Sequence, residues 1–184
     1  GEMFRLMLTG PRRYVEEFQR DVRASGLRGL DLAKYIHRSL EVKKGIIEVD
    51  EHERDLRRIL NYGHTFGHAL EAVTEYEVPH GLAVVWGLDV ANYIACRRGL
   101  LDPDLYAGIH AFITEHFAFP LSRALDAQEL IRGAKRDKKV ADGQINLVLL
   151  EQPGRLQIVK TPFDQELLNM VSDFIAEPHA FHCH

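Results

Sequence analysis

Apolar residues recur at helical spacing along most of this chain, and this pattern limits the possible folds more than any other feature. A side chain every three or four residues lines one face of an α-helix, whereas alternation at every second residue lines one face of a strand. Proline, glycine and aspartate mark the helix ends. The predicted helices cover Arg12–Ala24, a segment from Asp31 to about Val49, Leu56 to about Tyr76, the stretch between Gly81 and Gly99, and Asp102 to about Phe117.

One later region alternates instead. Ile145, Leu147 and Leu149 lie two residues apart, and a second alternating run covers 156–160 after a Pro-Gly pair, which is typical of a β-hairpin. Helical spacing returns after Pro162. We therefore predict a mainly α fold with a small β-hairpin, in which residues 1–178 form one helical domain and residues 179–184 form a disordered tail.

Composition and charge exclude several classes of protein. The chain is 46% hydrophobic and 27% charged, as in ordinary globular domains, and its net charge of −4 argues against nucleic acid as a partner. The most apolar stretch, Leu82–Cys96, is interrupted by Asp89 and is shorter than the roughly 20 residues of a membrane span. Two distant cysteines fit a reducing compartment, so we expect a cytoplasmic protein. Because the chain begins with Gly1 rather than Met, we expect a piece of something longer.

Polar side chains recur between positions 57 and 71 at spacings of four, three, four and three. On a continuous α-helix these positions share one face. They are Arg57, Asn61, His64, His68 and Glu71. Gly63 and Gly67 in the same stretch each cost about 1 kcal/mol of helix stability relative to Ala. We expect these glycines to let another backbone, or a ligand, come close.

A further histidine, His80, follows a break at Pro79. A histidine pair on a helix is often only solvated surface, but a helix, a turn and another histidine can place three ligands around one ion. Nitrogen ligands together with a carboxylate suit Zn²⁺ with one position left open. The pattern therefore favours a metal site over plain surface.

Other charged residues leave two interpretations open. Lys43 lies in the apolar stripe of Leu32, Ile36, Leu40 and Ile47, where its stem could pack with its head in water, or its cation could bind an anionic substrate. Glu53, four residues before Arg57, fits a surface ion pair as well as a site. Lys138 and Lys139 belong to a basic run that suits either a solvated loop or a phosphate or carboxylate site.

The stretch 60–71, followed by 79–81 and 83–84, resembles the signature of 3-dehydroquinate synthase and its sugar phosphate cyclase relatives. The resemblance extends to Lys43, to 50–57, to 137–139 and to the hairpin, and it corresponds to the C-terminal half of such an enzyme. It implies an N-terminal α/β domain that binds NAD and a helical domain that carries the metal. The 184 residues contain no Gly-rich βαβ segment, so we expect the NAD-binding domain to be absent from this chain.

The resemblance also implies roles for individual residues. The metal ligands would be Glu2, His64 and His80, binding Zn²⁺ or Co²⁺. Arg5 would replace a lysine that touches substrate, which keeps the charge but changes the geometry. His68 would handle protons at the phosphate end of the substrate. The remaining implied substrate-site residues are Lys43, Arg57, Asn61, Glu53 and one of Lys138 or Lys139.

The implied reaction converts 3-deoxy-D-arabino-heptulosonate 7-phosphate to 3-dehydroquinate and phosphate in the shikimate pathway, catalysed by a homodimeric carbon–oxygen lyase. Leu82 departs from the glutamate that these synthases commonly have, which leaves room for a related cyclase such as 2-deoxy-scyllo-inosose synthase. An iron-type alcohol or glycerol dehydrogenase is a rival that would need no anion clamp. A non-catalytic metal-binding or oligomerisation module is the rival from another class. We expect the isolated chain to be inactive.

Overall fold

The structure, a computed structural model, describes residues 1–49, 56–135 and 143–176. Helices make up most of this part of the chain, and two antiparallel strands form its sheet, so the predicted mainly α fold with a small hairpin is confirmed. The elements in chain order are α1 (Glu2–Thr9), α2 (Arg12–Ser25), the 3₁₀ turn η1 (Leu27–Gly29), α3 (Leu32–Val49), the 3₁₀ helix η2 (Leu56–Asn61), α4 (His64–Val73), α5 (His80–Arg97), α6 (Pro103–Phe117), α7 (Ala127–Lys135), β1 (Gln144–Gln152), β2 (Arg155–Pro162) and α8 (Gln165–Ala176).

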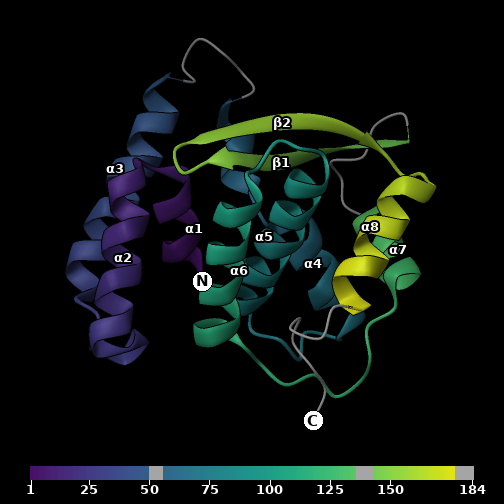
Figure 1. The fold of residues 1–184 in the computed structure, drawn as a ribbon, viewed down its shortest axis with the longest axis horizontal. Coiled ribbons are helices and arrows are strands. Elements are labelled where there is room, and N and C mark those ends of the chain that lie inside the picture. Colours follow the sequence, from purple (N-terminus) through teal and green to yellow (C-terminus); the bar gives the residue numbers. More distant parts are fainter. Residues whose placement is uncertain (50–55, 136–142, 177–184) are drawn as a thin grey trace.

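Helix α5 is the centre of the fold. It packs against α1, α4, α6, α8 and β1, and the ribbon shows it surrounded by these elements (Figure 1). Every residue from Ala83 to Ala95 is buried. The apolar stretch is thus the buried core helix that its length predicts, and neighbours cover it on all sides.

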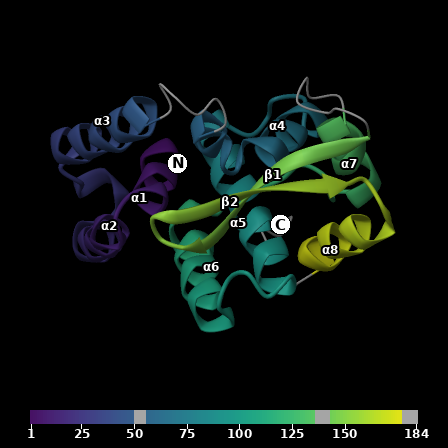
Figure 2. The ribbon, with the colours of Figure 1, turned by 90° about the horizontal axis from the view of Figure 1, so that it is seen from above.

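The hairpin lies across one end of the helices, as the view from above shows (Figure 2). Its register pairs Leu147 with Val159 and Leu149 with Gln157. Ile145, Leu147 and Leu149 are buried, as their alternation predicts, because the inner face of β1 packs on α5. Gly154 in the turn has a φ of +84° and donates its N–H to the carbonyl of Leu8, which ties the hairpin to α1.

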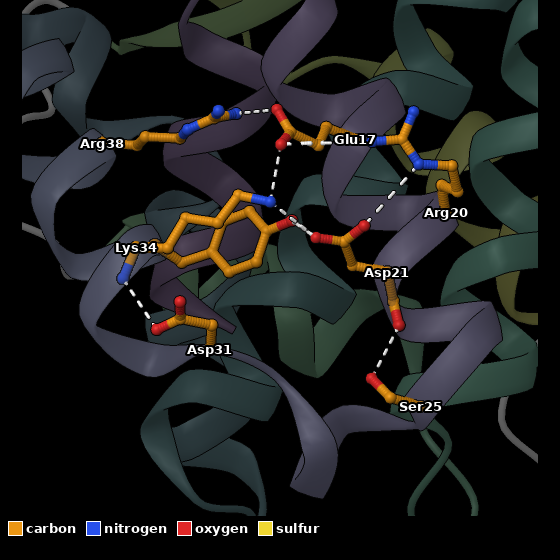
Figure 3. A network of polar contacts seen from close by, with 8 residues as sticks. Glu17, Arg20, Asp21, Ser25, Asp31, Lys34 and Arg38 are labelled. Atoms are coloured by element: carbon orange, nitrogen blue, oxygen red, sulfur yellow. Dashed lines mark hydrogen bonds and ion pairs between the residues drawn. The ribbon is translucent and has the colours of Figure 1, made fainter.

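A charged network fastens α3 to α2 (Figure 3). The Lys34 ammonium lies 2.5 Å from a carboxylate oxygen of Glu17 and 2.7 Å from one of Asp21, and Arg38 also contacts Glu17. The Tyr35 hydroxyl donates to Asp21 at 2.7 Å. Lys34 lowers the pKa of both carboxyls, whereas burial, helped by Asp21, raises the pKa of Tyr35 to about 12. These contacts decide which face of α3 turns inward.

The apolar stripe of α3 does not face the core, contrary to what its composition suggests. Leu32, Ile36, Leu40 and Ile47 are between 44% and 59% exposed in the described part of the chain. The buried positions are Tyr35, Ser39 and Val42, which share an adjacent face, about a quarter of a turn from the stripe, at spacings of four and three. Tyr35 makes an edge contact with Phe18 of α2 at 4.9 Å, so an aromatic anchor rather than the aliphatic stripe sets the rotation of this helix.

Two further differences concern helix bounds. The single helix predicted over 56–76 is broken, because η2 ends at Asn61 and α4 begins at His64, with Gly63 between them at a φ of +79°. Helices α1 and α7 were not predicted. Helix α1 is only eight residues long, so its stripe of Glu2, Arg5 and Thr9 is too short to establish a helical period in the sequence, and residues Phe4 to Thr9 are all buried.

Candidate metal and substrate site

Glu2 and Arg5 lie one turn apart on α1 and form an ion pair. The guanidinium of Arg5 donates to Oε2 of Glu2 at 2.6 Å and to the Leu60 carbonyl at 2.7 Å. Arg5 is only 3% exposed, so its contacts hold the Glu2 carboxylate in place and join α1 to η2. This arrangement turns the second oxygen of Glu2 toward the histidines of α4 and α5.

Glu2, His64 and His80 converge on one point. Oε1 of Glu2 lies 3.3 Å from Nε2 of His64 and 3.7 Å from Nε2 of His80, and one ligand atom from each of the three lies within 4.8 Å of the others. The two imidazole rings are 5.6 Å apart between centroids. Glu2 therefore meets two histidines that lie more than 60 positions further along the chain, and the three residues form a compact donor set of two nitrogens and a carboxylate.

The Glu2 carboxylate is ionised and has spare coordinating capacity. The His64 ring, followed by Arg5, lowers the pKa of Glu2 to about 2 against the opposing effect of burial. The contacts of Oε1 with the two histidines lack hydrogen-bond geometry, so this buried atom has no hydrogen-bond partner among the described residues. A divalent cation would satisfy that oxygen. The residues present therefore fit a metal ion.

The local backbone explains how His64 is aimed. His64 begins α4 directly after Gly63, whose left-handed conformation ends the 3₁₀ helix and starts a new helix direction. Nδ1 of His64 lies 3.2 Å from the Tyr62 carbonyl. When Nδ1 carries the ring proton, it can donate a hydrogen bond to that carbonyl, and the lone pair of Nε2 is then directed toward Glu2.

Helices α4 and α5 cross almost backbone to backbone, and glycines permit it. A Cβ at Gly63 would lie 2.6 Å from the Val84 carbonyl, one at Gly67 3.0 Å from the Ala83 carbonyl, and one at Gly87 2.1 Å from the carbonyl of Gly63. The prediction that Gly63 and Gly67 let another backbone come close is confirmed. The crossing sets the distance between the starts of α4 and α5, where the two histidines lie.

His68 lies beside this donor set. It is exposed, and its ring centroid is 5.4 Å from that of His64 and 5.9 Å from that of His80. Glu71, one turn further along α4, is buried and lies 3.0 Å from Nδ1 of His80. The sequence pattern placed Glu71 on this face without assigning it a role.

The other predicted site residues are distributed differently from the sequence pattern. Arg57 and Asn61 lie on η2, so they do not share one helix face with His64, His68 and Glu71. Lys43 is half-buried on α3, which packs against η2. Glu53, Lys138 and Lys139, and the histidines of the tail, lie outside the described residues.

Fold and site together define a helical domain with a candidate divalent-metal centre between its first, fourth and fifth helices. The family described as 3-dehydroquinate synthase C-terminal matches residues 1–140. The chain belongs to this family.

Curated relatives support the family. The chain is 35% identical over 147 residues to the 3-dehydroquinate synthase of Solibacter usitatus, covering 79% of this chain and 41% of that protein. It is 41% identical over 133 residues to the 3-dehydroquinate synthase of Rhodococcus opacus, covering 70% of this chain and 36% of that protein. The chain thus spans about two fifths of the length of these relatives.

Solved structures share the fold. A 2-deoxy-scyllo-inosose synthase complexed with carbaglucose-6-phosphate, NAD⁺ and Co²⁺ superposes with a TM-score of 0.72 at 18% identity, covering 94% of this chain and 49% of the other. The 2-epi-5-epi-valiolone synthase of Streptomyces hygroscopicus, with NAD⁺ and Zn²⁺ bound, gives 0.74 at 17% identity, covering 95% and 49%. Within the described ranges, no helix is both long and apolar enough to cross a membrane.

Proposed function

We propose that this chain is the metal- and substrate-binding part of a 3-dehydroquinate synthase, which converts 3-deoxy-D-arabino-heptulosonate 7-phosphate to 3-dehydroquinate and phosphate. The convergence of Glu2, His64 and His80 from three separate segments carries the proposal. Family membership and the naming of relatives as 3-dehydroquinate synthases support the same reaction. The protein would act as a cytoplasmic homodimer.

The donor set has a defined task in this proposal. Glu2, His64 and His80 would hold Zn²⁺ or Co²⁺, and Arg5 would keep Glu2 oriented while also meeting the substrate. Bound there, the cation would supply Lewis-acid polarisation of a substrate oxygen, and NAD, held mainly by an NAD-binding domain, would supply the hydride transfer. The two-histidine, one-carboxylate set leaves a coordination position open for that oxygen.

The remaining residues would bind and protonate the substrate. Its carboxylate and phosphate need cations, which Lys43, Arg57 and one of Lys138 or Lys139 would supply. Asn61 would hydrogen-bond to substrate, and Glu53 would help hold the site. His68, exposed beside the donor set, would move a proton at the phosphate end through one ring nitrogen.

A related sugar phosphate cyclase is the second candidate, because Leu82 follows His80-Gly81 where dehydroquinate synthases commonly have glutamate. Titration calorimetry on the metal-loaded chain separates the two. We expect 3-deoxy-D-arabino-heptulosonate 7-phosphate to bind more tightly than carbaglucose-6-phosphate, because it carries a carboxylate in addition to its phosphate and both groups would meet cations. The reverse order would favour the second candidate.

Metal analysis tests the assignment of the ligands. The purified 184-residue chain should hold about one equivalent of Zn²⁺ or Co²⁺. A His64→Ala variant should lose it, whereas His37→Ala should retain it, because His37 is exposed on α3 and belongs to none of the described ligand groups. Unchanged metal content in His64→Ala would refute the assignment. Phosphate release by the chain alone would contradict its proposed dependence on the NAD-binding domain.

A further inference from the structure

Glu71 is a buried carboxylate with no role in the proposed reaction. It is 8% exposed, near the C-terminal end of α4. Its Oε1 lies 3.0 Å from Nδ1 of His80, the first residue of α5. A buried carboxylate needs hydrogen bonds or a positive charge, and the imidazole provides such a contact.

This contact determines which nitrogen of His80 is available to a cation. A carboxylate can only accept a hydrogen bond, so the proton of the neutral imidazole is placed on Nδ1. The lone pair then lies on Nε2, the atom that is 3.7 Å from Oε1 of Glu2. Histidine ligands of metals commonly donate their second nitrogen to a carboxylate or a backbone carbonyl in this way.

The backbone between the two residues is built to make the contact. Glu75 and Tyr76, with φ values of 50° and 63°, occupy the left-handed region, which is unfavourable for residues other than glycine. The amide of Tyr76 donates to the Glu71 carbonyl at 2.7 Å. This tight turn reverses the chain after α4 and brings His80 back beside Glu71.

We propose that Glu71 is a positioning residue of the metal site, which holds Nε2 of His80 toward the cation bound by Glu2 and His64. The inference rests on the proposed function, since it assumes that these residues bind a divalent ion. His64 is oriented by the neutral Tyr62 carbonyl, whereas His80 is oriented by an anion. Glu71 therefore strengthens His80 as a ligand in addition to aiming it.

The same residues allow a competing arrangement. His68, Glu71 and His80 also each offer one ligand atom within 4.8 Å of the others. In that arrangement Glu71 would itself bind a second cation. The two arrangements differ in the number of ions per chain and in the nitrogen of His80 that is coordinated.

Competition with a chromophoric chelator measures the affinity of the 184-residue chain for Zn²⁺, and the absorption of bound Co²⁺ reports the coordination. We expect one ion per chain and a 10- to 100-fold weaker affinity in Glu71→Gln, which replaces the anion by a neutral amide of the same size. Glu16→Gln, which changes an exposed carboxylate on α2, should bind as the wild type does. Glu2→Gln, which alters a ligand, should weaken binding more than Glu71→Gln and change the Co²⁺ spectrum.

Each outcome has a separate meaning. Wild-type chain without Zn²⁺ affinity would overturn the proposed function and this inference with it. If the wild type binds Zn²⁺ and Glu71→Gln binds it equally well, the inference alone is overturned. The same holds if the wild type binds two ions and the variant binds one. If the variant does not fold by circular dichroism, ¹⁵N NMR of the wild-type His80 ring decides. Metal at Nε2 with a proton on Nδ1 supports the inference, and metal at Nδ1 overturns it.

Discussion

Replacing Gly87 by alanine tests whether the close crossing of α4 and α5 supports both the fold and the site. The new Cβ would lie 2.1 Å from the carbonyl oxygen of Gly63 and 2.4 Å from the amide nitrogen of Gly67, whereas ordinary contacts begin near 3.4 Å. Both neighbours are backbone atoms, which cannot rotate away. The two helices must therefore move apart by roughly 1 Å, an overpacking strain of the kind that core substitutions introduce.

Such overpacking costs about 1–3 kcal/mol, and the backbone clash places Gly87→Ala at the upper end, about 3 kcal/mol. In a domain of this size 1 kcal/mol lowers the melting temperature by about 2–4 °C, so the variant should melt roughly 6–12 °C below the wild type. His64 and His80 begin the two helices, so their separation should also grow. Distances between a metal ion and its ligands vary by only about 0.2 Å, so a larger separation of the two histidines should weaken metal binding as well.

Thermal denaturation followed by circular dichroism, with and without Zn²⁺, measures both effects. Gly108→Ala is the matched control, because a Cβ at this position of α6 meets nothing within 4 Å. That variant should be as stable as the wild type or more so, by about 0.5–1 kcal/mol, since alanine favours a helix over glycine. A Gly87→Ala variant that melts and binds Zn²⁺ like the wild type would refute the crossing geometry.

Three other changes test the rest of the fold. Phe4→Ala removes a fully buried ring that lies within 5.6 Å of three other phenylalanine rings and should cost about 3–5 kcal/mol in urea unfolding; a loss below 1 kcal/mol would contradict this packing. Asp102→Ala removes the carboxylate that accepts two backbone N–H bonds at the start of α6 and should cost about 0.5–2 kcal/mol, with Asp102→Asn retaining most of the stability. Lys34→Met removes the cation that lowers the pKa of Glu17 and Asp21. A carboxyl whose pKa is lowered in the folded state stabilises the fold at pH values above its ordinary pKa, here 4.5 for Glu17 and 3.8 for Asp21, and loses that contribution as the pH falls. The loss of stability in Lys34→Met relative to the wild type should therefore be full at pH 7 and shrink below pH 4.5. A loss of stability that is independent of pH would contradict the network.

Much of the architecture follows from local signals in the sequence. Pro11 and Gly26 bracket α2, Asp102 caps α6, and alternation identifies both strands. These signals act within a few residues, so they are visible without the rest of the fold. The motif around His64 likewise indicates the family, which the match over residues 1–140 confirms.

Other features of the fold could not be predicted from short stretches of the sequence. The helix predicted across 56–76 breaks at Gly63, because the left-handed conformation there lets η2 and α4 both pack closely on neighbouring elements. Helix α3 carries two faces with apolar residues, and its packing on α1, the contact of Tyr35 with Phe18 and the network on α2 together choose between them. Periodicity describes which faces are possible, whereas burial depends on what lies opposite.

The sequence by itself determined the helical class, the hairpin and the residue types of the site. The tertiary structure decided which of those residues meet: it joins Glu2 to His64 and His80, adds Glu71 behind His80, and separates Arg57 and Asn61 from the face that the spacing suggested. The physical reason is that spacing along a helix extends only as far as the helix continues. Convergence of distant segments depends on how closely two backbones can approach, and at this site glycines in α4 and α5 set that distance.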